Sequence, residues 1–387
     1  MKTDASPATI FHVITAVWGR DFIELFLTTG IPYQLGTGNL AALPEGSRYR
    51  ILTAAADRAR LENANEMRAL RARLPVDIVV MDEDPGDATR YRRMIRYHRR
   101  AVEDALRCEA TLVFLAPDHV LATGTMARLV ERRAEGYRAV VCPALRLSKE
   151  SMLDTLAEYG THDVPPRTLV RLALQHLHPL TLEHMADAQA FSRHPTSVYW
   201  PVTGGGLVAR CFSLHPLMID PVRRQLPRRE IDSDYLWRSV PDRALVYVVT
   251  DSDDLVVFEL SSTRNVVPSG RQMWSKVWRT ATVANLCDPH QLTFWHQPIR
   301  LHWKDVDASW AAAEMESARF AERVLGWLPL ARRVYPFTHR ASQWRQRWDR
   351  RSREWRRRLP RVRLKQVKRP LVIAVHHTRK RLQRVLR

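Results

Sequence analysis

The sequence lacks the features that mark several classes of protein. Its four cysteines form no CxxC pair and no short regular spacing, which excludes a cysteine zinc site and a disulfide scaffold and fits a reducing cytosol. No run approaches the ~20 apolar residues that a membrane-spanning helix requires. The apolar stretch 10–17 contains His12 and Thr15 and precedes no small-residue cleavage site. It therefore predicts a first strand and not a secretory signal.

Acidic residues are scarce near the C-terminus, and this sets the charge distribution. The formal net charge of the 387 residues is +20. Residues 340–387 contain nineteen Lys or Arg and two acidic residues, a net of +17, which leaves +3 for the first 339 residues. The basic character therefore belongs to a tail and not to the body of the protein.

Hydrophobic residues make up 45% of the chain, enough for a sizeable core in one or two domains. In the first 145 residues, runs typical of strands alternate with helical patterns. Such alternation predicts an α/β fold with a mostly parallel sheet flanked by helices. The expected strands are 10–17, 49–53, 76–81, 111–115 and 139–143, and the expected helices are 58–74, 88–107 and 123–135.

The stretch "TLVFLAPDHVLATGTMARLVERRAEGYRAVVCP", residues 111–143, predicts a βαβ unit. Its helix has Thr123 as the expected N-cap and ends at Gly136. Asp118 lies just past the carboxyl end of the first strand, where open α/β sheets bind ligands.

The second half of the chain has a different sequence pattern. Residues 146–200 have a helical pattern and are rich in histidine and proline. A strand pattern returns in "VYWPVTGGGLVAR" (198–210), and residues 243–260 contain two strand-like runs around an acidic turn. We expect these strands to elaborate the same sheet, with helices following through residue 330.

The order of these segments and two short motifs resemble GT-A-fold glycosyltransferases of the broad family 2 type, over roughly residues 10–260. In "FLAPDHVLATGTMARLVE", Asp118 matches the second aspartate of the family's Asp-x-Asp, while Ala116 replaces the first. The resemblance implies that Asp118 binds Mn²⁺ or Mg²⁺, which stabilises the leaving nucleotide diphosphate. The alternative is that Asp118 only caps a loop.

The second motif, "REIDSDYLWR" (229–238), resembles the family's general-base segment. By position, Asp232 would be the catalytic base of an inverting enzyme, Asp234 would support it, and Arg238 would lie beside the diphosphate. Ile231 stands where the family has a glutamate, and Glu230 is expected at the substrate. Carboxylates this close together also fit a solvated helix start.

Other candidate residues follow from position in this fold. Gly204 and Gly205 would line the acceptor side, although a glycine run also suits a bend. Strand-end residues would meet the nucleotide, although Trp18 is as well explained as a core residue. His302 loosely resembles a late metal-binding histidine, and an ordinary buried histidine is the alternative. The nucleotide-binding candidates are Thr15, Trp18, Thr53 and Asp82.

The domain organisation expected from the resemblance is a GT-A-like domain over residues 1–262. Residues 1–145 would form its nucleotide-binding half and 146–262 its acceptor half. Residues 263–339 would be a helical C-terminal extension, and 340–387 a basic amphipathic tail.

In the tail, "RASQWRQRWDRRSREWRRRL" (340–359) places Trp344, Trp348 and Trp355 on one narrow face of an arginine-rich helix. Such a face predicts binding to an anionic membrane surface. Single-stranded nucleic acid is the rival partner, because arginine also binds phosphate and tryptophan also stacks on bases. A solvated tail is the third alternative.

These expectations describe a cytoplasmic glycosyltransferase at the inner face of the cell membrane, which transfers a sugar from a nucleotide-sugar donor to a glycan or lipid-linked acceptor. Two alternatives stay open. One is a nucleic-acid-binding protein that acts through its tail, and the other is a GT-A-like binding protein without activity, since Ala116 and Ile231 depart from the acidic pattern.

Deletion of residues 340–387 should abolish sedimentation with anionic liposomes and leave a folded body that still binds nucleotide. Nearly all the excess positive charge lies in the deleted segment. Full-length protein should bind anionic vesicles far better than neutral ones, and ~0.5 M salt should weaken this binding by screening. Tight binding to single-stranded nucleic acid, with no vesicle binding, would contradict the membrane interpretation.

Overall fold

The computed structural model describes residues 9–82, 89–264, 271–272, 276–286, 292–331 and 333. Residues Met1–Leu328 form one compact unit, and Pro329–Arg387 form a second. The basic tail and most of the acidic stretch 81–87 lie outside the described residues. Within the described part of the chain, no helix is long and apolar enough to cross a membrane.

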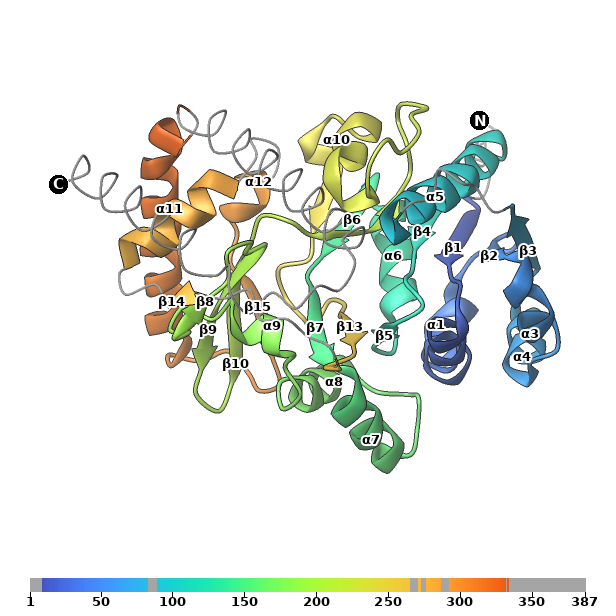
Figure 1. Ribbon diagram of the computed structural model, residues 1–387, viewed down its shortest axis with the longest axis horizontal. Coiled ribbons are helices and arrows are strands. Elements are labelled where there is room, and N and C mark those ends of the chain that lie inside the picture. The colour runs from blue at the N-terminus through green and yellow to red at the C-terminus, as the bar shows by residue number, and fades with distance from the viewer. Residues whose placement is uncertain are drawn as a thin grey trace, which may run out of the picture. The chain divides into compact units, whose positions relative to one another are not determined.

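The main sheet of the first unit has seven strands among the described residues, in the order β12-β6-β11-β4-β1-β2-β3. Figure 1 labels β6, β4, β1, β2 and β3, which appear in that order across the sheet. Six strands run in one direction, and β11 is antiparallel to both of its neighbours. The predicted mostly parallel sheet is therefore confirmed. Its strands are β1 (Phe11–Ala16), β2 (Arg48–Ala54), β3 (Val76–Met81), β4 (Thr111–Phe114), β6 (Ala139–Cys142), β11 (His215–Ile219) and β12 (Val246–Val248).

Alternating side chains of these strands enter two separate cores. Leu112 and Phe114 share one core with Tyr97 and Val102 of α5 (Arg90–Arg107). The intervening Val113 lies in the other core, with residues of α3 (Arg58–Glu62), α4 (Asn65–Arg73) and α6 (Thr125–Ala134). The sheet therefore has helices on both faces. The single helix expected over 58–74 is wrong in one respect, because α3 and α4 are separate helices.

Two three-stranded sheets accompany the main one. The first contains β9 (Ser197–Val202), β10 (Gly206–Cys211) and β15 (Ile299–His302), and the second contains β5 (His119–Leu121), β7 (Ala144–Ser148) and β13 (Val257–Ser261). Of the later strands in the described residues, only β11 and β12 join the main sheet, so the expectation that the second half extends that sheet is correct only in part. A short pair joins β8 (Ala190–Phe191) to β14 (Arg271–Gln272).

The remaining helices are short, apart from one at residues 310–331. Near the N-terminus they are α1 (Arg20–Leu25) and α2 (Ile31–Leu35). The later ones are α7 (Lys149–Tyr159), α8 (Pro166–Ala173), α9 (Pro179–Leu182), α10 (Leu236–Ser239), α11 (Lys276–Leu286) and α12 (Leu292–Trp295).

The predicted βαβ unit differs from the structure in two details. Thr123 is not the N-cap of α6, because the left-handed Gly124 (φ 79°) precedes the helix and the Thr123 N–H donates to Val164 O (3.0 Å). In addition, β4 and β6 are parallel but not adjacent, since β11 lies between them.

The glycine run at 204–206 forms the turn and first strand residue of the β9–β10 hairpin. Gly205 N–H donates to Val202 O (3.1 Å), and Gly204 has a positive φ of 68°. A Cβ at Gly206 would overlap Leu301 O and lie 2.9 Å from the Cα of His302. Gly206 is thus required by the close pairing of β10 with β15.

Gly206→Ala should lower the free energy of unfolding by ~2 kcal/mol or more, because the backbone of β15 must move away from the new methyl group. Gly204→Ala is the matched control, since its methyl group would meet no atom within 4 Å and only the strain of its positive φ remains. Urea denaturation of both variants measures the difference. Equal destabilisation would contradict the close contact.

Candidate functional site

Asp118 lies between the end of β4 and the start of β5. Its backbone C=O accepts a hydrogen bond from Leu260 N–H of β13 (2.9 Å). The side chain is half-buried. Burial, followed by the negative charge of Glu259, raises the pKa of the Asp118 carboxyl well above its usual range. Asp118 therefore lies on a connection that is tied to β13 and partly shielded from solvent.

Glu259 reaches this position because β13 pairs with β5 on one side and β7 on the other. Its register partners are His119 and Arg146. The Arg146 guanidinium holds the Glu259 carboxylate at two points, Nε to Oε1 (2.8 Å) and Nη2 to Oε2 (3.3 Å). Ser261 Oγ also donates to Oε1 (2.8 Å). The carboxylate is thus fixed in orientation and paired with a positive charge.

Asp232 lies in the one-turn helical segment Ile231–Tyr235, and its side chain is exposed. Desolvation by the surrounding protein raises the pKa of the Asp232 carboxyl, and the charges of Glu230 and Glu259 act in the same direction. His215 opposes them. Glu259 therefore acts electrostatically on both Asp118 and Asp232, the two carboxylates expected to carry the chemistry.

His215, on β11, is the neighbouring base. Its Nε2 lies 2.8 Å from Phe114 O, and since a carbonyl only accepts, Nε2 carries the proton. Burial lowers the pKa of His215. The ring is therefore neutral and fixed in one tautomer. His119 contacts it edge to face, with 4.8 Å between ring centroids.

Arg238 makes two hydrogen bonds and one ion pair with other described residues. Nη2 donates to Gln225 Oε1 (2.8 Å), Nη1 donates to Leu226 O (3.2 Å), and Nη1 lies 3.8 Å from Asp234 Oδ2. These contacts tie α10 to the segment before it. Asp234 and Arg238 are neighbours, as their spacing predicted, but the guanidinium is used within the protein.

Two of the nucleotide-side candidates are buried threonines near the carboxyl ends of β1 and β2. The Thr15 hydroxyl lies 2.6 Å from Tyr49 Oη, which in turn donates to Gln34 Oε1 (2.7 Å). The Thr53 hydroxyl is also buried and has no hydrogen-bond partner among the described residues. Thr15 therefore serves a core network, whereas Thr53 has an unused hydrogen-bonding group.

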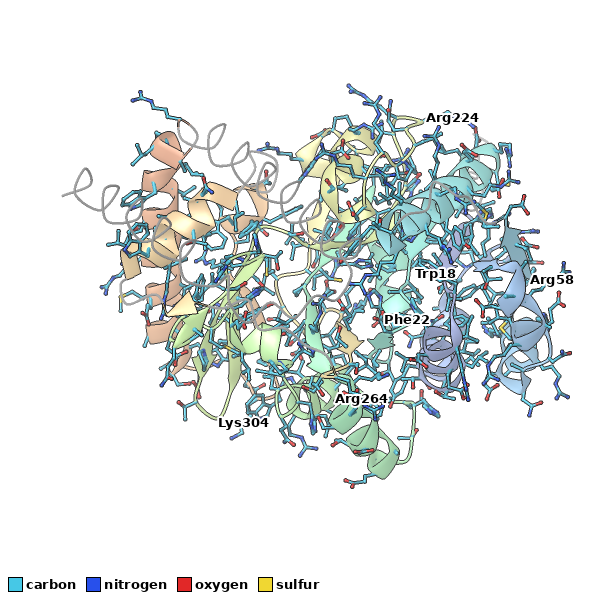
Figure 2. The ribbon with its side chains drawn as sticks, in the orientation of Figure 1. Trp18, Phe22, Arg58, Arg224, Arg264 and Lys304 are labelled. Atoms are coloured by element: carbon cyan, nitrogen blue, oxygen red, sulfur yellow. The ribbon has the colours of Figure 1, made fainter. Side chains whose placement is uncertain are left out.

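Trp18 and Asp82 lie at the same edge of the sheet, after β1 and β3. Trp18, labelled in Figure 2, is half-buried. Its ring forms a T-shaped contact with Tyr97 (5.2 Å between ring centroids), and the Arg93 guanidinium carbon lies 5.8 Å from the centroid of the Trp18 ring. Asp82 is exposed, and its backbone C=O accepts from Arg96 (2.7 Å). Arginines of α5 thus approach both positions.

His302 belongs to a separate candidate metal centre. Its Nε2 lies 2.8 Å from Asp251 Oδ1 and 3.8 Å from Asp253 Oδ2, and the three ligand atoms lie within 4.8 Å of one another. His302 Nδ1 donates to Lys304 O (2.7 Å), the kind of contact that orients metal-binding histidines. This group offers one nitrogen and two oxygens to a metal ion. Among the described residues, no hydrogen bond or ion pair joins His302 to Asp118.

The same three residues have protein partners of their own. Arg167 pairs with Asp253 through Nε and Nη2, and also with Asp305. Asp251 Oδ1 accepts from Asp253 N–H (2.8 Å), which closes the turn after β12. A metal ion here would therefore compete with an arginine for one carboxylate.

Gly204 and Gly205 are accounted for by the β9–β10 turn. A Cβ at Gly205 would lie 3.2 Å from Trp310 Nε1, so that glycine is required by packing against the helix 310–331. In the described part of the chain, no hydrogen bond connects either glycine to Asp118 or Asp232. A surface hollow of about 720 Å³ lies next to this hairpin, and its lining includes Val202, Thr203 and Arg279.

Sequence reasoning missed Glu259, Arg146 and His215. Glu259 stands alone as a charged residue in the apolar run "LVVFEL" (255–260), and this isolation is the one local signal that it serves a site. Arg146 and His215 have no comparable signal, because their roles come from strand pairing between distant segments.

Asp118→Asn should stabilise the protein at alkaline pH. Because the pKa is higher in the folded state than its unfolded value of about 4, the charged carboxylate opposes folding, and stability falls as pH rises through the folded pKa. The neutral amide removes that loss, on the order of 1 kcal/mol at about pH 9. Urea denaturation at about pH 5 and about pH 9 tests this, with the exposed Asp154→Asn as control. A variant less stable than wild type at both pH values would contradict it.

No family model matches the sequence, and no curated protein matches it either.

Proposed function

We propose that this chain is a nucleotide-sugar-dependent glycosyltransferase of the GT-A type, acting on a glycan or lipid-linked acceptor with inversion. Asp118 and Asp232 come from separate motifs that resemble one family, and the fold brings the two motifs to neighbouring strands. Asp118 follows β4, and the segment that contains Asp232 packs against β11, the neighbour of β4 in the sheet. Asp118 also follows a central parallel strand, at the edge where open α/β sheets bind ligands.

Asp232 would act as the general base. An acceptor hydroxyl needs a group that takes its proton as the new bond forms, and a carboxylate with a raised pKa does this better near neutral pH. Its exposed side chain leaves room for an acceptor. His215 donates from Nε2 to Phe114 O, so the Nδ1 of its neutral ring would carry a lone pair. The ring would therefore bring no positive charge to the site.

A divalent cation, when bound, would supply positive charge to the leaving diphosphate. The residues at Asp118 fit it only in part, because Ala116 offers no ligand and Glu259 is already paired with Arg146. Asp118 would therefore hold Mn²⁺ or Mg²⁺ mainly together with the nucleotide. The group of Asp251, Asp253 and His302, with its nitrogen donor, suits Mn²⁺ better than Mg²⁺.

The nucleotide would lie along the ends of β1 to β3, where Trp18 offers part of its ring and Asp82 is exposed. The tail 340–387 would hold the protein at the anionic inner face of the cell membrane, near a lipid-linked acceptor.

Asp232→Asn should bind donor normally and lose transfer by about 10²- to 10⁴-fold, since the amide accepts no proton. The donor is first identified by thermal shift with uridine, guanosine and thymidine diphosphate sugars, with and without Mn²⁺. Donor consumption and product formation are then compared with Asp154→Asn, a control at an exposed carboxylate of α7 outside both motifs, which should retain the full rate.

Near-normal turnover of the Asp232 variant would assign the base elsewhere. Failure of every nucleotide sugar to stabilise the wild type would contradict the proposed function. Loss of donor binding in Asp232→Asn would indicate a role in binding and not in catalysis.

A further inference from the structure

The Arg146 guanidinium is fixed on one side and unoccupied on the other. Nε and Nη2 are held by the two oxygens of Glu259. Among the described residues, no group accepts a hydrogen bond from Nη1. The side chain is 41% exposed, so Nη1 can reach a ligand. A guanidinium oriented in this way loses little further freedom on binding an anion.

Strand pairing brings Arg146 close to Asp118. The Asp118 C=O accepts a hydrogen bond from Leu260 N–H, and the preceding Glu259 is the register partner of Arg146 in β7. Lys149 is the first residue of α7, immediately after that strand, and both cations act electrostatically on the Asp118 carboxyl. These two cations are the groups through which this part of the chain could hold an anion with several oxygens.

The incomplete acidic motif leaves the diphosphate with less positive charge from a metal ion. With Ala116 in place of a carboxylate, metal binding at Asp118 has one protein ligand fewer. Arg238, expected beside the diphosphate, donates to Gln225 and Leu226 of the segment before α10. Arg146 is instead the guanidinium that strand pairing brings to β13 beside Asp118.

We propose that Arg146, through Nη1 and assisted by Lys149, binds the diphosphate of the donor and neutralises the leaving group beside Asp118. This inference rests on the proposed function. In the transfer, the bond between the sugar carbon and the phosphate oxygen breaks and its electron pair stays on the diphosphate next to Arg146. The acceptor oxygen bonds to the sugar carbon, and its proton passes to Asp232.

Binding of UDP and GDP, each compared with its nucleoside, tests the proposal by titration calorimetry in the presence of EDTA. Arg146→Gln should weaken diphosphate binding ~10- to 100-fold, the usual effect of removing a charged hydrogen bond, and leave nucleoside binding unchanged. Arg146→Lys should keep part of the affinity, because it retains the charge but not the fork. Arg128→Gln is the matched control, since this α6 arginine pairs with Glu131 and is 46% exposed.

Glu259 variants separate binding from folding. Glu259→Gln keeps the Arg146 charge and should bind diphosphate at least as tightly as wild type. The double variant Arg146→Gln/Glu259→Gln leaves no unpaired carboxylate and should still lose diphosphate binding. An equal loss in Glu259→Gln and Arg146→Gln would overturn the proposal in favour of a structural ion pair.

Diphosphate binding by Arg146→Gln at wild-type affinity overturns the role of Arg146 and leaves the proposed glycosyltransferase intact. Parallel loss of nucleoside and diphosphate binding also overturns it, because the defect would then not concern phosphate. If the wild-type protein binds neither UDP nor GDP and is stabilised by no nucleotide sugar, both the proposed function and the role of Arg146 fail.

Discussion

The pairing of β13 with β5 on one side and β7 on the other is the constraint on which the arrangement around Asp118 depends. It brings Glu259 opposite His119 and Arg146 at the same level of the sheet. The register is held by burial, because the flanking Phe258 and Leu260 are almost wholly inaccessible. A shift of one residue would expose this apolar pair and bury the carboxylate. The hydrophobic effect thus fixes the position of a charged group.

Much of the main sheet was predictable because its strands are locally distinct. Val76–Met81 has the predicted bounds, and the other early strands differ by a residue or two at their ends. Local pattern does not determine which strands are neighbours. Nothing in residues 111–143 indicates that β11, from far along the chain, separates β4 from β6. The start of α6 was misplaced for a related reason, since the conformation of Gly124 replaces the side-chain cap expected from Thr123.

The candidate-site residues that belong to a contiguous motif were predictable from the sequence. Those that meet only because distant strands pair were not. Asp118 and Asp232 were predicted from short local patterns, and burial raises the pKa of both carboxyl groups. Arg146 and Glu259 form a pair only because two distant strands have one register. In the same way, β15 brings His302 beside the turn at 251–253, a contact that no local pattern indicates. The residues that act electrostatically on the two candidate carboxylates are thus the ones that sequence reasoning could not reach.

The position of β11 also has a consequence for biosynthesis. As the chain leaves the ribosome, β1 to β4 can pair as soon as Phe114 has emerged, but β6 must wait for β11, about seventy residues later. At ordinary rates of translation this interval is on the order of several seconds. During it, the free edge of β4 and the apolar residues of β6 have no permanent neighbour. The nascent chain is therefore most vulnerable to aggregation midway through its synthesis, and this is the stage at which a chaperone would have the greatest effect.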